Sequence, residues 1–179
     1  MQRIVPAILS LPQHLEALTR EPVIYRPVAC PHCGLARLWG HGCYARKADR
    51  RPGPGGSLNP IPIPRFFCQG CRQTCSRLPQ CIAPRRWYDW AVQQVVLLCV
   101  VGGGSLHQAA VRGGVDRHTV RRWRTWLHGR SEEFGFWLRA RFAELGRALD
   151  FTEFWQGCLQ AMPLSRAMAW LDREGVAIP

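Results

Sequence analysis

The chain has 179 residues and a formal net charge of +12 at pH 7, which suits one medium domain or two small ones with a polyanionic partner. Its longest apolar run, Val95–Val101, is far shorter than the roughly 20 residues of a membrane-spanning helix. The run Ile4–Leu11 contains Pro6 and follows a single arginine, so it does not predict a signal peptide. We therefore expect a soluble, cytoplasmic protein with no membrane partner.

The positive charge is concentrated between Arg26 and Arg130, where the acidic residues are Asp49, Asp89 and Asp116. Nearly all of this charge is arginine, whose planar guanidinium group binds phosphates and guanine bases through two parallel hydrogen bonds. The concentration predicts that the middle of the chain contacts a polyanion.

The first 20 residues predict a short helix after a start that proline interrupts. Leu9, Leu15 and Leu18 are its apolar positions. No side chain here suggests chemistry, so we interpret the segment as a packing arm.

Two Cys-x-x-Cys pairs form the first chemical unit, and the segments between them predict a β-hairpin. Leu35–Arg46 and Ile61–Phe67 are the expected strands, and Arg51–Pro60 is a turn-rich loop between them. Cysteines three residues apart can direct both sulfurs at one ion, and two such pairs supply a tetrahedral Zn²⁺ site. We predict a zinc ribbon, stabilised by zinc because the segment is too rich in glycine and proline to fold on apolar burial alone. The predicted ligands are Cys30, Cys33, Cys68 and Cys71.

The other cysteines leave alternatives open. Cys75 and Cys81 lie close enough in sequence to replace Cys68 or Cys71 as ligands, although we favour a core position for both. A second metal on Cys43, Cys75 and Cys81 is a weaker alternative, and no role is assigned to Cys99 or Cys158. Buried free thiols are the alternative to any metal site.

Trp87–Val101 predicts the first helix of a three-helix unit, and Gly102–Gly104 marks its end. Its expected core positions are Trp90, Val95, Leu98 and Val101. Arg85 and Arg86 precede it, and either phosphate contacts or simple solvation would account for them.

The stretch Ser105–Trp126 predicts two helices joined by a sharp turn. Gly114 can adopt a positive φ in the turn, and Asp116 is a suitable N-cap for the second helix. The small side chains of Ala109 and Ala110 allow the helices to cross closely.

The second of these helices has an apolar back and a basic front. Val120, Trp123 and Leu127 recur at spacings of three and four residues, so they share one face. A buried helical hairpin with solvated arginines is the alternative to a DNA-reading helix. For a DNA-reading helix we predict base contacts from Arg117, His118, Arg121 and Arg122, Thr125 on the same outer face, and phosphate contacts from Arg112 and Arg124.

Ser105–Trp126 resembles the helix-turn-helix of bacterial regulators and transposases. The pattern Cys-Pro-x-Cys-Gly … Arg-Phe-Phe-Cys-x-x-Cys-Arg-x-Thr resembles the N-terminal zinc ribbon of insertion-sequence transposases, which directly precedes such a motif. The resemblance covers about Cys30 to Leu127 and implies binding to double-stranded DNA. Gly113 stands where that family has a bulky apolar residue, which predicts a frayed helix end. Cys75 stands where such ribbons usually have an aromatic residue.

After Gly129 the composition becomes slightly acidic and rich in aromatic residues. Ser131 is the expected N-cap of a new helix, and Phe151–Met162 and Leu164–Arg173 predict two more, separated by Pro163. We interpret this region as a packing surface or as an interface for a second copy of the chain or a recombinase. The apolar positions of its first helix are Phe134, Trp137, Leu138, Phe142, Leu145 and Leu149.

The sequence thus predicts an α+β protein that binds DNA and is not an enzyme, because the carboxylates after Arg130 lie on predicted helices without strand-borne partners for a two-metal site. The main hypothesis is a sequence-specific double-stranded DNA-binding protein of mobile-element type, acting as a targeting or regulatory subunit or as a transposase remnant. The alternatives are an adaptor that binds a recombinase or polymerase, and an RNA-binding ribbon. The expected parts are an N-terminal arm (1–25), the zinc ribbon (26–84), the helix-turn-helix domain (85–130) and the helical packing region (131–179).

Overall fold

The computed structural model describes residues 3–50, 52–84 and 87–178. These residues form six α-helices and a small antiparallel sheet, so the predicted α+β class is confirmed. The chain divides into two compact units, the first ending at Asp89 and the second comprising Trp90–Ile178. Among the described residues, every helix is too short or too polar to cross a lipid bilayer.

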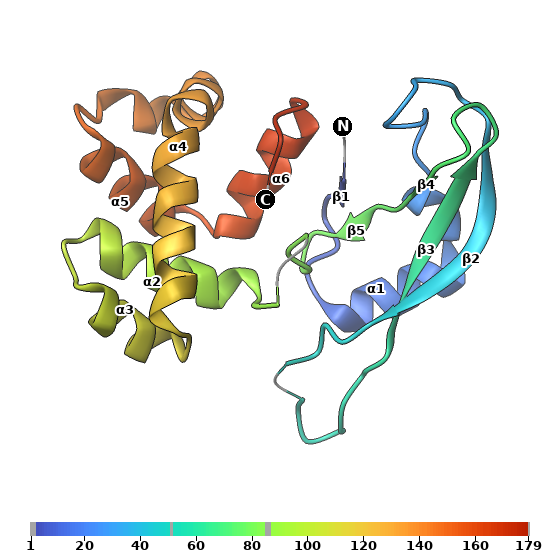
Figure 1. Ribbon diagram of the computed structural model, residues 1–179, viewed down its shortest axis with the longest axis horizontal. Helices are drawn as coiled ribbons and strands as arrows, with labels where there is room; N and C mark the ends of the chain where they lie inside the picture. The colour runs from blue at the N-terminus through green and yellow to red at the C-terminus, as the bar shows by residue number, and fades with distance from the viewer. Residues whose placement is uncertain (1–2, 51, 85–86, 179) are drawn as a thin grey trace. The chain divides into compact units, whose positions relative to one another are not determined.

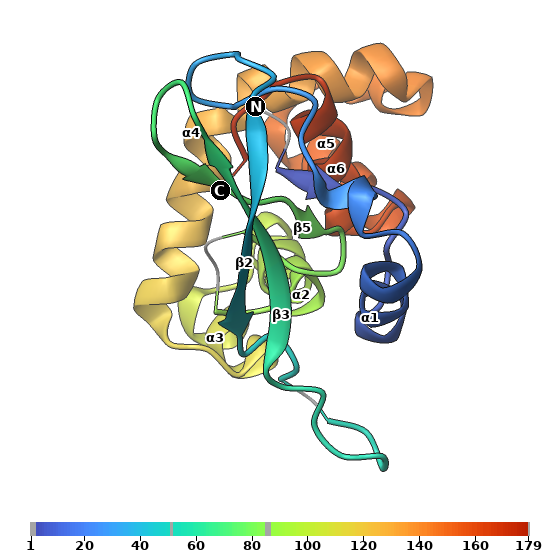
Figure 2. The same cartoon turned by 90° about the vertical axis from the view of Figure 1, so that its right-hand side faces the viewer.

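A twisted antiparallel hairpin dominates the first unit (Figures 1 and 2). Strands β2 (Leu38–Arg46) and β3 (Ile61–Cys68) pair along most of their length, and β4 (Thr74–Cys75) adds to the other edge of β3. The register shifts between Gly40 and Cys43, where Gly42 has a positive φ of 68°. The predicted strands are confirmed, whereas the third strand and a short parallel pair, β1 (Ile4–Val5) with β5 (Leu78–Pro79), were not predicted.

The turn-rich loop (teal in Figure 2) continues the hairpin beyond its strands. Asp49 and Asn59 close its base: the Asn59 side chain accepts a hydrogen bond from the Asp49 N–H (3.0 Å) and donates one to the Asp49 carbonyl (2.6 Å). Arg51 of this loop lies outside the described residues, as do Arg85 and Arg86, for which phosphate contacts and simple solvation were the alternatives.

Helix α1 (Leu11–Arg20) confirms the predicted N-terminal helix. The side chain that it buries, however, is not one of the predicted leucines. Ser10 caps it in a capping box with Gln13, which explains where it begins. Leu9, a predicted apolar position, precedes the helix and is 62% exposed, whereas His14 is fully buried. A 3₁₀ helix, η1 (Pro22–Tyr25), follows α1.

The second unit is entirely helical. Helix α2 contacts α3, α4, α5 and α6 and so lies at its centre (Figure 1). Its elements are α2 (Trp90–Val101), α3 (Leu106–Gly113), α4 (Arg117–Arg141), the 3₁₀ helix η2 (Ala143–Arg147), α5 (Phe151–Ala161) and α6 (Leu164–Arg173).

Two of the four core positions predicted for α2 are wrong. Trp90 and Val101 are buried, but Val95 is 45% exposed and Leu98 is only half-buried. Helix α2 is apolar on nearly every side, so periodicity could not select the face that packs. The buried residues of α2 are Trp90, Val92, Gln93, Val96, Leu97, Cys99 and Val101.

The helix predicted to begin after Ser131 does not exist as a separate element, because α4 runs without interruption from Arg117 to Arg141. The Ser131 hydroxyl accepts a hydrogen bond from Trp155 Nε1 (2.9 Å) instead of capping a helix. Phe134 and Leu138 continue the apolar face of the first half of α4 at spacings of seven and four residues, so one buried stripe supports the whole helix. Of the remaining apolar positions predicted here, Phe142 and Leu145 are buried, Trp137 is half-buried and Leu149 is 93% exposed.

Candidate metal centre and basic helix surface

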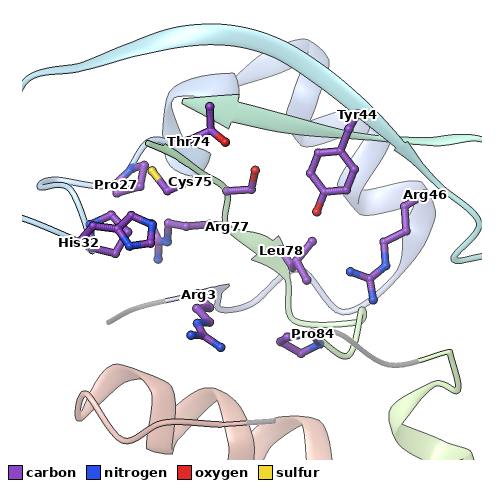
Figure 3. A pocket seen from close by; sticks show the side chains of 12 residues that line it. Arg3, Pro27, His32, Tyr44, Arg46, Thr74, Cys75, Arg77, Leu78 and Pro84 are labelled. Carbon is purple, nitrogen blue, oxygen red and sulfur yellow. The ribbon is translucent and has the colours of Figure 1, made fainter. Parts of the chain in front are cut away.

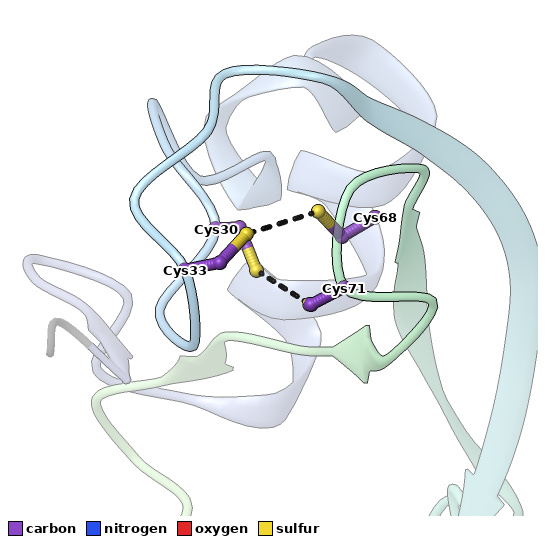
Figure 4. Close-up of side chains that lie close together, drawn as sticks. All are labelled: Cys30, Cys33, Cys68 and Cys71. Carbon is purple, nitrogen blue, oxygen red and sulfur yellow. Dashed lines mark hydrogen bonds between the residues drawn. The ribbon is translucent and has the colours of Figure 1, made fainter.

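The four predicted metal ligands lie together at the end of the hairpin opposite the turn-rich loop. Cys30 and Cys33 precede β2, Cys68 ends β3, and Cys71 lies in the turn before β4 (Figure 4). Their Sγ atoms all lie within 4.8 Å of one another, and the Cys30–Cys71 and Cys33–Cys68 Sγ pairs are each 3.6 Å apart. A tetrahedron with metal–sulfur bonds of about 2.3 Å has sulfur–sulfur edges of about 3.8 Å. The four sulfurs are therefore spaced to hold one metal ion.

The two Cys-x-x-Cys turns have the same backbone pattern. In the first, the Cys30 carbonyl accepts a hydrogen bond from the Gly34 N–H (2.8 Å), and the Cys30 N–H donates to Leu35 O (2.8 Å). In the second, the Cys68 carbonyl accepts from the Arg72 N–H (2.9 Å). Gly34 and Arg72 occupy equivalent positions and both have positive φ, 75° and 57°. Each pair of sulfurs is thus presented by a tight turn with its own hydrogen bonds.

The four thiols influence one another's protonation. The pKa of Cys68 is lowered to about 7, first by a backbone hydrogen bond from Cys71 and also by the Cys33 thiol. A backbone hydrogen bond from Gln73 lowers the pKa of Cys71, but burial and the neighbouring thiols outweigh it and raise that pKa to about 12. Thiolates this close repel one another, so a cation at the centre is needed for all four to ionise.

The other cysteines are not part of this cluster. Among the described residues, the group of potential ligands close enough to share an ion consists of the four cysteines alone. Cys75 is buried beside them in the same hydrophobic core, and burial raises its pKa. Cys43 is exposed on β2, and Cys81 is half-buried with a pKa raised to about 11 by burial. Cys99 and Cys158 are buried in the second unit.

The turn between α3 and α4 has the predicted geometry. Gly114 adopts a left-handed conformation (φ 60°), and the Val115 N–H returns to the Ala110 carbonyl at 3.0 Å. Asp116 caps α4 by accepting hydrogen bonds from the Thr119 N–H (2.8 Å) and hydroxyl (2.7 Å), and these bonds lower its pKa. Ala109 is fully buried, as expected where helices cross closely.

The predicted fraying at Gly113 does not occur, because α3 continues through this residue. A Cβ atom at position 113 would lie 2.3 Å from Val96 Cγ2 of α2. Valine 96 therefore occupies the space that a bulky side chain at position 113 would need, and glycine allows the two helices to approach.

The residues of α3 and α4 that were predicted to contact DNA lie on the surface, and the predicted apolar back of α4 is buried. Val120, Trp123 and Leu127 are at most 1% exposed. Within the described part of the chain, no carboxylate forms an ion pair with the arginines among these predicted DNA contacts, which are Arg112, Arg117, Arg121, Arg122 and Arg124. The exposed residues, here called the basic face, are Arg112, Arg117, His118, Arg121, Arg122, Arg124 and Thr125.

Comparison with known proteins identifies one region that contains both the cysteine cluster and most of the basic face. Searches of curated proteins and of solved structures found no match. A family profile does match the chain, from the first of the clustered cysteines to a core residue of α4, and it covers more than half of the sequence. The chain belongs to the family described as a domain of unknown function, DUF6431, which it matches over residues 30–123.

Proposed function

We propose that the four-cysteine cluster is a structural zinc site and that the hairpin bearing it is a zinc ribbon. Four thiolates leave no open coordination position, which is the arrangement of structural rather than catalytic zinc. Soft thiolate donors also favour Zn²⁺ over Mg²⁺ or Ca²⁺. Elemental analysis of the purified protein is the direct test, with one equivalent of zinc expected.

The proposed activity of the whole protein is sequence-specific binding of double-stranded DNA, with α3 and α4 as a helix-turn-helix. The observation that carries it is the basic face, which combines exposed arginines without carboxylate partners and a fully buried back. The capped, sharply turned start of α4 supports the same proposal, because groove-reading helices contact bases with their N-terminal residues. In cellular terms we propose a targeting or regulatory subunit of a mobile element, or a transposase remnant.

Apart from Arg112 of α3, the basic face lies on the first part of α4. Arg117 to Thr125 fall within its first three turns, whereas Phe134 and Leu138 pack into the core of the second unit. The first part of α4 therefore packs through its back and leaves its basic side exposed, which is the side that would enter a major groove.

A protein-binding adaptor is the second candidate function. The observation that favours it is the exposure of large apolar side chains on the second unit: Phe136 is 67% exposed and Leu149 is 93% exposed. Exposed apolar residues of this size are common at protein interfaces. In this case DNA contact would be incidental.

Arg121 provides the sharpest test of the DNA-binding proposal. Selection from a random duplex library identifies the preferred sequence, and fluorescence anisotropy then measures affinity at a fixed salt concentration. We expect Arg121→Ala to weaken binding to that sequence by about 1–3 kcal/mol and to relax preference at one base pair. Arg147→Ala is the matched control, since it removes the same charge from an exposed position in η2 of the same unit.

The possible outcomes separate the two candidate functions. Equal losses for Arg121→Ala and Arg147→Ala would contradict a specific role for the basic face. A loss for Arg121→Ala that is the same on every sequence would assign Arg121 to phosphate contact. Steep weakening of binding with salt is expected of a DNA-binding protein, whereas an adaptor keeps its protein partner over the same range.

A further inference from the structure

The sheet of the first unit has a hydrophobic core against one face and exposed aromatic side chains on the other. Neighbouring residues of a strand point to opposite faces, and residues that pair across strands share a face. Leu38 and Phe66 are buried in the core beside Tyr25. Trp39 and Phe67, the next residues along β2 and β3, therefore point to the opposite face.

These two residues belong to a row that crosses β2, β3 and β4. Trp39 pairs with Phe67, and Phe67 pairs with Thr74. Trp39 is 59% exposed, Phe67 is half-buried and Thr74 is exposed. The exposed ring of His41 lies 5.8 Å from the ring of Phe67, measured between their centroids. The surface formed by Trp39, His41 and Phe67 is here called the aromatic face.

The aromatic face ends where the same side of the hairpin becomes covered. Tyr44, which pairs with Ile63, packs against a second hydrophobic core. Tyr44 and Thr74 also line a cavity of about 280 Å³, together with the segment that follows β4 (Figure 3). Packing within the chain thus accounts for Tyr44. It does not account for Trp39, which leaves most of its surface in water.

The charge around the aromatic face is positive. Arg65 of β3 points to this face by the same alternation, and Arg37 and Arg72 are exposed close to the ends of β2 and β4. The segments 35–46 and 61–75, which contain the three strands, have no Asp or Glu. Among the described residues, no carboxylate forms an ion pair with any of these three arginines.

Exposed rings surrounded by positive charge are the features with which proteins bind single-stranded nucleic acids. Unpaired bases stack on aromatic rings, while cationic side chains contact the phosphates. A duplex hides the faces of its bases inside the helix, so it cannot use exposed rings in this way. An apolar protein partner would bury the rings but would not need the arginines.

We propose that the aromatic face binds single-stranded DNA, with bases stacked on Trp39 and Phe67 and the phosphate backbone beside Arg65. The choice of DNA rather than RNA rests on the function proposed for α4. The stacking does not, because it uses residues of the first unit and a form of nucleic acid that the basic face does not read.

The test is fluorescence anisotropy of a labelled thymidine oligonucleotide of about 12 nucleotides, titrated with the full-length, zinc-loaded protein. Such an oligonucleotide does not pair with itself. We expect Trp39→Ala to weaken binding about 5- to 150-fold, the loss expected for one stacked base. Trp39→Phe keeps a ring and should retain most of the affinity. Trp87→Ala is the matched control, because Trp87 is a 65% exposed tryptophan of the same unit that lies outside the sheet.

Salt dependence distinguishes stacking from charge. The loss caused by Trp39→Ala should be the same at every salt concentration, since this substitution removes no charge. Arg65→Gln should instead reduce the slope of log K against log salt by about 0.7, the value for one phosphate of a single strand. Circular dichroism and zinc content establish that each variant is folded.

Several results would overturn the proposal. Equal affinities in the Trp39→Ala and Trp87→Ala variants would exclude stacking, and an unchanged salt slope in Arg65→Gln would exclude a backbone beside Arg65. Tighter binding of the matching uridine oligoribonucleotide would overturn the choice of DNA. A dimer that sedimentation detects in the wild type but not in Trp39→Ala would assign the aromatic face to a second copy of the chain.

Duplex binding measured on the same variants separates this proposal from the function proposed for α4. Trp39→Ala should bind the preferred duplex as well as Trp87→Ala does, and Arg121→Ala should bind the oligonucleotide as well as Arg147→Ala does. A protein that binds the oligonucleotide but no duplex would refute the function of α4 alone. A protein that binds the duplex but not the oligonucleotide would refute the aromatic face alone.

Discussion

His14 shows how one polar side chain can become part of a hydrophobic core. Its ring is fully buried, with Nε2 2.9 Å from the Pro62 carbonyl and Nδ1 2.5 Å from the Tyr25 hydroxyl. A carbonyl only accepts, so Nε2 carries the proton of the neutral ring and Nδ1 accepts from Tyr25. Both ring nitrogens are thus satisfied, and the interaction connects α1, η1 and β3.

This environment makes the stability of the first unit depend on pH. Burial lowers the pKa of His14 below 6.5, and the hydrogen bond to Pro62 only partly opposes that shift. Above pH 6.5 the ring is neutral in both folded and unfolded chains and causes no pH dependence. Below pH 6.5 the unfolded chain takes up a proton before the folded one does, so the free energy of unfolding falls.

Urea unfolding of the wild type and of His14→Gln between about pH 5.5 and 7.5 measures this effect. The stability advantage of the wild type should be constant in the upper part of the range and shrink below pH 6.5. Groups that titrate in both proteins cancel in the difference. A constant difference across the whole range would show that His14 is not held neutral.

At the scale of the element, the contact between α2 and α3 depends on a missing side chain. Gly113 of α3 faces Val96, which is fully buried in α2. By contrast, Gly129 lies in the middle of α4, and a Cβ atom there would meet nothing within 4 Å. The two helical glycines therefore have opposite expected responses to substitution.

We expect Gly113→Ala to lower the free energy of unfolding by about 1–3 kcal/mol, because the added methyl overpacks the contact with Val96. Gly129→Ala should raise it by up to about 1 kcal/mol, since alanine has the higher helix propensity. Thermal and urea unfolding measure both. Combining Gly113→Ala with Val96→Ala should cost less than the sum of the single changes, and strict additivity would count against a direct contact.

At the scale of the whole molecule, the two units should respond differently to metal removal. The cysteine cluster is embedded in a hydrophobic core of the first unit, with Cys30 and Cys68 buried beside Tyr25 and Leu38. The second unit has its own core of aromatic and aliphatic residues on α2, α4, α5 and α6. Structural zinc contributes on the order of 10 kcal/mol to the folding of small domains that bind it.

Treatment with a chelator should therefore unfold the first unit and leave the second folded. Hydrogen exchange is the appropriate measurement, with protection lost in β2 and β3 and retained in α2 and α4. Cys30→Ser should behave like chelation, whereas Cys43→Ser, at an exposed position outside the cluster, should keep one zinc per chain. Full protection of β2 and β3 in protein shown to contain no metal would refute the structural role.

Local patterns were sufficient to predict much of this protein. The paired cysteines, the hairpin around the turn-rich loop, the capped turn at Gly114 and Asp116, and the buried back of α4 are all determined by residues close together in sequence. Cysteine spacing, a positive-φ glycine, a capping carboxylate and 3.6-residue periodicity each have a local physical cause.

Other features were decided only when distant segments packed together. The exposed face of α2 around Val95, the uninterrupted course of α4 past Ser131 and the tight contact at Gly113 depend on neighbouring helices that supply buried partners. The pairing of His14 with Tyr25 and the row of Trp39, Phe67 and Thr74 across three strands depend in the same way on segments brought together by the sheet. Sequence patterns indicate which side chains can be buried. The residues that pack against each of those side chains are decided only by the tertiary structure.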